Sequence, residues 1–181
     1  MSAKRTVDLT VGTLLLITLA PLLAAAAAAV AAGSPGPVLR RAERAGLGGR
    51  TFTVFTFRTT HEGALTPVGR LLRRHFLELL PQLLNVVRGE MSLVGPRPLA
   101  APAGRGGTAR ARLAVRPGVT GLWQVGGRSE LPWEEMDVLD LHYVEQHWLG
   151  LDLAILLRTP SAAARGRRRD LTVHPVPVRV A

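Results

Sequence analysis

Residues 9–32 form an uncharged, strongly apolar stretch that constrains the fold more than any other feature of the chain. The stretch is rich in Leu, Ile, Val and Ala, and it follows the basic pair Lys4 and Arg5. It is about as long as a helix that crosses a bilayer. A spanning helix, a cleaved signal peptide and a hairpin that enters the membrane and returns are all open. We predict an inserted helix, because the stretch is long for a signal peptide.

Pro21 lies in the middle of this stretch and is the predicted break of the membrane helix. Proline has no backbone N–H and kinks a helix, which suits a bent span as well as a re-entrant hairpin. Beyond Gly33 the sequence becomes rich in Gly and Pro, as in a turn. We therefore divide the chain into a membrane-inserted segment (1–33), a domain (34–160) and a basic tail predicted to be disordered (161–181).

The chain carries a formal net charge of +10 at pH 7. This charge favours anionic partners: membrane lipids, nucleic acids or phosphorylated substrates. No groove-reading motif or aromatic stacking platform is recognisable, so we predict no nucleic-acid partner. The chain has no cysteine, which excludes a disulfide framework, a thiol nucleophile and a thiolate zinc site. Anionic membrane lipid stays as a predicted partner.

The remaining pattern predicts a helix-rich α+β domain. Residues 51–57 are rich in β-branched and aromatic side chains and predict one short strand. Residues 40–49 combine arginines with glycines and predict a basic, flexible loop suited to lipid head groups. The strand is thus expected to follow a loop.

Helices are expected on both sides of Pro81. Thr66 is a suitable N-cap for the first helix, whose apolar positions recur at helical spacing as far as Leu79. Pro81 is expected to interrupt or restart that helix. A further helix is predicted over residues 133–147, with acidic residues near its start to suit the helix dipole.

Residues 81–98 carry a longer motif that periodicity does not explain, with the sequence PQLLNVVRGEMSLVGPRP. This motif resembles the signature of the bacterial sugar transferases, the monotopic phosphoglycosyl transferases that begin surface-polysaccharide assembly. Similar sequence continues in the Phe-Arg-Thr of residues 57–59 and in VRPGVTGLWQV at residues 115–125. The resemblance extends through nearly the whole chain, as far as Pro160, and looks like the minimal form of the family.

The resemblance implies a membrane enzyme. Members transfer a sugar phosphate from a nucleotide-diphosphate sugar to polyprenol phosphate, which starts exopolysaccharide or glycoconjugate assembly. A UDP-sugar is the expected donor. The implied attachment is monotopic: the chain returns near Pro21, so that its bulk lies on the cytoplasmic face of the bacterial inner membrane.

The family's catalytic step needs an acidic pair. An aspartate attacks the proximal phosphate to form an acyl-phosphate intermediate, and the next residue, a glutamate, helps to hold Mg²⁺. This chain has Glu78 and Leu79 at the matching positions. The resemblance therefore assigns Glu78 as the catalytic residue and Mg²⁺ as the cofactor. The metal ligands are unknown, because leucine cannot bind a cation; Glu90 or Asp140 could replace the missing carboxylate.

Four arginines match family positions that lie near phosphates or in the Phe-Arg-Thr motif. They are Arg58, Arg73, Arg97 and Arg128. The guanidinium group suits bidentate contacts to phosphate, so these residues are the predicted phosphate-binding set. Other positions depart from the family pattern, among them Ala42 in place of glutamine and Thr56 in place of the lysine before Phe-Arg-Thr.

Two functions follow from these observations. The first is an active sugar-phosphate transferase in which Glu78 takes the place of aspartate. The alternative is a catalytically inactive paralogue that binds the membrane and a nucleotide sugar or lipid phosphate, because Leu79 and the other departures lie in functional regions.

Overall fold

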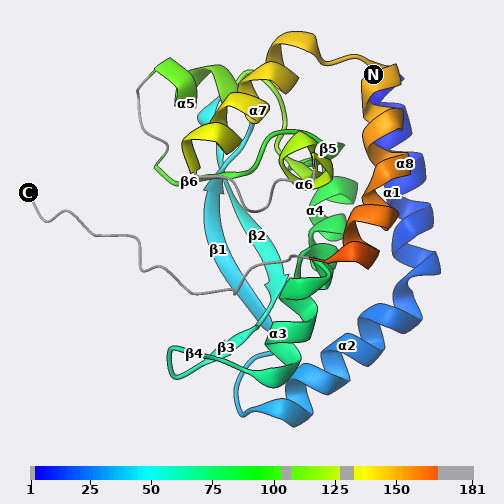
Figure 1. Ribbon diagram of the computed structural model, residues 1–181, viewed down its shortest axis with the longest axis vertical. Helices are drawn as coiled ribbons and strands as arrows, with labels where there is room; N and C mark the ends of the chain where they lie inside the picture. The colour runs from blue at the N-terminus through cyan, green and yellow to red at the C-terminus, as the bar shows by residue number, and fades with distance from the viewer. Residues whose placement is uncertain (1–2, 103–106, 127–132, 167–181) are drawn as a thin grey trace, which may run out of the picture.

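The computed structural model describes residues 3–102, 107–126 and 133–166. The domain combines many helices with small sheets, as the α+β prediction expected (Figure 1). The α-helices are α1 (Ala3–Thr18), α2 (Ala20–Gly33), α3 (Pro67–Arg74), α4 (Leu83–Arg88), α5 (Gly107–Arg112), α6 (Leu122–Val125), α7 (Trp133–Gln146) and α8 (Leu149–Arg165). Two 3₁₀ helices are η1 (Leu47–Gly49) and η2 (Leu77–Gln82). Helices α1, α4 and α8 lie to the right of the main sheet in Figure 1.

The strands form three separate sheets. They are β1 (Leu39–Ala45), β2 (Thr51–Phe57), β3 (Thr60–His61), β4 (Ala64–Leu65), β5 (Ser92–Val94), β6 (Leu99–Ala100) and β7 (Gly118–Thr120). The largest sheet has the order β2-β1-β6 with antiparallel pairing, β3 and β4 form a hairpin, and β5 pairs with β7 in parallel. The predicted strand over residues 51–57 is therefore confirmed as β2.

The apolar N-terminal stretch folds as two helices, which run along one side of the molecule (Figure 1). Their axes are bent by 59°. Pro21 lies in the first turn of α2, where its missing N–H costs no helical hydrogen bond, and the two helices separate at Leu19, two residues before it. In the described part of the chain, no single helix meets the length and hydropathy criteria for a membrane span, whereas this bent pair meets them together.

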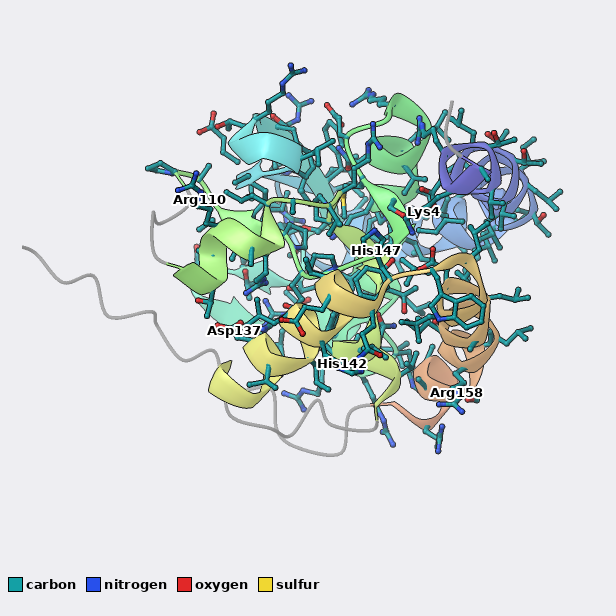
Figure 2. The ribbon with its side chains drawn as sticks, turned by 90° about the horizontal axis from the view of Figure 1, so that it is seen from above. Lys4, Arg110, Asp137, His142, His147 and Arg158 are labelled. Carbon is teal, nitrogen blue, oxygen red and sulfur yellow. The ribbon has the colours of Figure 1, made fainter. Side chains whose placement is uncertain are left out.

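Polar side chains bind the start of α1 to the rest of the domain. Lys4 Nζ lies 2.6 Å from the Asp152 carboxylate on α8 and 3.1 Å from the Tyr143 hydroxyl on α7 (Figure 2). Burial, reinforced by Asp152, raises the pKa of Tyr143, so that its hydroxyl stays protonated. Asp8 accepts a hydrogen bond from the Ser92 hydroxyl at the start of β5. The first turns of α1 are therefore part of the folded domain.

The described apolar core has two clusters. The first contains Val54, Leu83, Val86, Met91, Leu93, Val94, Tyr143 and Ile155. The second contains Ala26, Val30, Phe57 and Leu72, and so packs α2 against β2 and α3. Burial of such side chains, at about 25 cal/mol per Å² of apolar surface, is the main force holding the helices to the sheet.

The predicted loop over residues 40–49 is wrong. Most of it is strand β1, which pairs with β2 along its whole length and with β6 at its end. The strand was hidden because exposed charged side chains, including Arg40, Arg41 and Glu43, occupy both of its faces. Backbone pairing on two sides stabilises the strand without an apolar alternation.

The helix that begins after Thr66 is shorter than predicted. Thr66 caps it as expected, with its hydroxyl accepting from the Gly69 N–H at 2.9 Å. The helix ends at Arg74, and Phe76 then takes a left-handed conformation. Pro81 lies inside the following 3₁₀ helix instead of at the helix break. The apolar spacing continued to Leu79 because η2 also packs against the core.

The sequence predicts that the domain ends at residue 160 and that a disordered tail follows. Helix α8 passes through Pro160 and ends at Arg165, so residues 161–165 are helical. The predicted helix over residues 133–147 is confirmed as α7. Residues 167–181, which hold the rest of the predicted tail, lie outside the described residues.

Candidate functional site

Glu78 lies in η2, which the chain enters through an uncommon backbone conformation. Phe76 has φ 58°, a value that bulky residues rarely adopt, and its ring packs edge-on against Trp123 with centroids 6.3 Å apart. Glu78 is only 8% exposed. Such strain costs about 1–3 kcal/mol and tends to occur at functional sites. The turn thus holds a carboxyl group at a fixed place in the interior.

Arg73 accompanies Glu78. Its Nε donates a hydrogen bond to the Thr59 hydroxyl at 2.9 Å, which orients the guanidinium from the last turn of α3. Burial lowers the pKa of Arg73, the carboxylate of Glu78 raises it, and the charge of Arg40 lowers it further. The structure therefore brings together Glu78 and Arg73, two of the predicted site residues.

Arg58 binds the end of α2. Its guanidinium donates to the Ser34 carbonyl at 2.7 Å and the Ser34 hydroxyl at 3.0 Å, and also to the Pro35 carbonyl. These contacts hold the turn that follows the last residue of α2, Gly33. The structure thus places Arg58 against the exit of the apolar helix pair, and its binding of phosphate stays a prediction.

Arg97 belongs to a partly buried charge cluster that we name the Arg97 cluster: Arg97, Arg112, Asp137 and Asp140. Arg97 lies 2.8 Å from Asp137 and 3.2 Å from Asp140, and Arg112 lies 2.7 and 2.8 Å from the same two carboxylates. Figure 2 labels Asp137 on α7. Burial raises the pKa of Asp140, and the charges of Arg112 and Arg97 oppose the shift. The cluster joins the loop after β5 to α5 and α7.

Comparison with known protein families gives a match over most of the chain. Residues 1–166 match the model of the bacterial sugar transferase family. The chain belongs to this family. The motif over residues 81–98 that suggested the relationship spans α4, β5 and the loop that carries Arg97.

This bacterial sugar transferase has relatives of different lengths. It is 41% identical over 180 residues to the UDP-glucose:undecaprenyl-phosphate glucose-1-phosphate transferase of Caulobacter vibrioides, covering 86% of this chain and 67% of that protein. It is 39% identical over 174 residues to the uncharacterized sugar transferase EpsL of Bacillus subtilis, covering 88% and 86%. It is 40% identical over 187 residues to the undecaprenyl-phosphate glucose phosphotransferase of Komagataeibacter xylinus, but spans only 35% of that protein.

The carboxylates considered as replacements for the missing glutamate of this sugar transferase have other partners. Glu90 accepts a 2.6 Å hydrogen bond from Asn85, and Asp140 is paired with Arg97 and Arg112. Within the described ranges, no group of three or more His, Asp or Glu side chains could hold a metal ion. A Mg²⁺ ion held by protein ligands alone therefore does not fit these residues.

Sequence reasoning missed Arg112 and the ordering role of Asn85. Asn85 is fully buried and joins α4 to β2, donating to the Thr53 carbonyl at 2.7 Å and accepting from the Phe55 N–H at 3.3 Å. Arg112 lies 25 or more positions before its carboxylate partners, so no local spacing marks it. Arg128, the fourth predicted phosphate ligand, lies outside the described residues.

Proposed function

We propose that this chain transfers a sugar phosphate from a nucleotide-diphosphate sugar, expected to be a UDP-sugar, to polyprenol phosphate. The observation that carries the proposal is the buried Glu78 carboxyl beside Arg73, in a chain of this family. Relatives are named for transfer of glucose 1-phosphate or glucose phosphate to undecaprenyl phosphate, and others for exopolysaccharide production. The reaction would start assembly of an exopolysaccharide or glycoconjugate.

The proposed chemistry has two displacement steps. The Glu78 carboxylate attacks the sugar-bearing phosphorus, and the bond from that phosphorus to the bridging oxygen breaks, which releases the nucleoside monophosphate. A phosphate oxygen of polyprenol phosphate then attacks the same phosphorus and frees the carboxylate. Arg73 offsets the negative charge on the phosphates. We propose that Mg²⁺ arrives with the diphosphate, because it is commonly bound through substrate phosphates and water.

The helix pair is proposed to re-enter the membrane and return. Lys4 ties the start of α1 to the domain, and Arg58 ties the end of α2 to the same domain, which favours a hairpin over a span. Leu14 and Ile17 on α1 are 62% and 68% exposed. Exposed apolar side chains on such a helix favour contact with lipid. The bulk of the chain would then lie at the cytoplasmic face of the inner membrane, beside anionic lipid.

Side-specific labelling tests this topology. Because the chain has no cysteine, single cysteines can replace Ala3, the first residue of the helix pair, and Thr51, which follows the pair; both positions are exposed. A membrane-impermeant maleimide should label both in inside-out vesicles and neither in intact spheroplasts. Labelling of the two positions from opposite sides would contradict re-entry.

Trapping of the covalent intermediate tests the function. Membranes that contain the full chain are incubated with Mg²⁺ and UDP-glucose, without polyprenol phosphate, and quenched in acid. The peptide that contains Glu78 should gain the mass of a hexose phosphate and lose it in hydroxylamine. An unmodified Glu78 peptide, in a preparation that does release UMP, would contradict Glu78 as the nucleophile.

A further inference from the structure

Two arginines of β1, Arg40 and Arg44, lie on one face of the main sheet. The antiparallel register places Arg40 directly opposite Thr56 of β2, and directly opposite residues share a face. Alternation along the strands puts Arg44 and Val54 on that face too. Val54 is buried in the first core cluster, and β2 packs against η2, the helix that holds Glu78.

The charge of Arg40 acts on both Arg44 and Arg73. Burial lowers the pKa of Arg44, and the charge of Arg40 lowers it further. Arg40 acts on the pKa of Arg73 in the same direction, whereas Glu78 opposes it. Charges influence one another in this way only at short range, since water and salt screen distant pairs. Arg40 therefore lies close to both Arg44 and Arg73, and Arg73 in turn lies close to the carboxylate of Glu78.

Arg40 is the member of this group that faces solvent. It is exposed, whereas Arg44 and Arg73 are partly buried. Among the described residues, no Asp or Glu lies within ion-pair distance of Arg40. An incoming group with more than one negative charge would neutralise the positive charges of these three arginines.

We propose that Arg40, Arg44 and Arg73 form a binding site for a diphosphate group, with Arg40 as its solvent-facing ligand. The proposal rests on the proposed function, because the diphosphate would be that of the nucleotide sugar beside Glu78. Position 56, where this sequence has threonine in place of the family's lysine, lies directly opposite Arg40. Arg40 thus supplies from the neighbouring strand a positive charge that position 56 lacks.

Direct binding measurements test the site without requiring turnover. The full chain in nanodiscs is titrated with inorganic pyrophosphate, and separately with UDP, by isothermal titration calorimetry. Arg40→Gln should weaken both affinities about tenfold or more, as loss of a charge-assisted hydrogen bond predicts. Arg41→Gln is the matched control: Arg41 is the next residue of β1, lies on the opposite face and stacks over Phe55. The affinities of Arg41→Gln for pyrophosphate and UDP should differ from those of the wild type by less than about twofold.

A second substitution tests the cross-strand geometry. In the Arg40→Gln background, Thr56→Lys should restore most of the lost affinity, because position 56 presents its side chain on the same face. The bound phosphate could belong to the nucleotide or to polyprenol phosphate, and nanodiscs with and without polyprenol phosphate distinguish the two. If the site binds the nucleotide's diphosphate, Arg40→Gln should weaken binding in both kinds of nanodisc. A defect seen only with polyprenol phosphate present would overturn the assignment.

The remaining outcomes are equally decisive. The proposed diphosphate site would be wrong if the wild type and Arg40→Gln bound with equal affinity, or if the wild type did not bind pyrophosphate. Either result would count against the site even if the chain releases UMP. Binding with the expected Arg40 dependence, in a chain that releases no UMP, would support the site and count against the proposed function. Arg40→Lys keeps the charge and should lose less affinity than Arg40→Gln, which separates a charge effect from a folding defect.

Discussion

Replacing Glu78 by aspartate and Leu79 by glutamate together will raise nucleoside monophosphate release about a hundredfold. The glutamate carboxyl group lies one methylene farther from the backbone than the family's aspartate, and a misplacement of about 1 Å can cost on the order of a hundredfold in rate. Leu79 is only partly buried, so a carboxylate at that position keeps access to water and to a cation. The initial rate of UMP release from UDP-glucose measures the gain.

The matched control adds a carboxylate to α4, the helix that follows η2. Leu84 lies on α4 and is 36% exposed, so Leu84→Glu introduces the same charge without changing η2. We expect its rate to equal that of the wild type. A double variant no faster than the wild type would show that the Glu78-Leu79 pair is not what limits turnover. Release by the double variant alone would instead favour the inactive-paralogue alternative.

Sequence reasoning succeeded where a local physical rule decides the structure. Three local features each determine the backbone within a few positions. They are a proline in an apolar helix, a threonine followed by a proline at a helix start, and a run of β-branched and aromatic residues. The bend before Pro21, the cap at Thr66 and strand β2 follow from these rules. The family motif placed Glu78 near Arg73, and the structure brings the two together.

Long-range contacts decided the parts that sequence reasoning missed. Strand β1 has charges on both faces and depends on backbone pairing with β2 and β6, which no window of its own sequence shows. The contacts of Arg58 with the end of α2 join residues more than 20 positions apart, so no local spacing shows them. Phe76 takes a left-handed conformation and packs against the distant Trp123, and helical spacing alone shows neither, so it extended the first helix too far.

The second large effect is expected at Glu78 itself. Glu78→Gln keeps the size and burial of the side chain but removes the charge that attacks phosphorus, and loss of a nucleophile lowers turnover by at least about a thousandfold. Glu145→Gln makes the same chemical change at an exposed position of α7 and should leave the rate within about twofold of the wild type. A melting temperature of Glu78→Gln close to that of the wild type would exclude unfolding as the cause.

The most direct test of the account is UMP release by membranes that contain the wild type, Glu78→Gln or Glu145→Gln, each supplied with UDP-glucose, Mg²⁺ and undecaprenyl phosphate. We expect release by the wild type and Glu145→Gln, and none above the empty-vector background by Glu78→Gln. Equal release by all three would contradict the role of Glu78. No release by the wild type, while the Caulobacter relative is active in parallel, would contradict the proposed transferase activity with this donor.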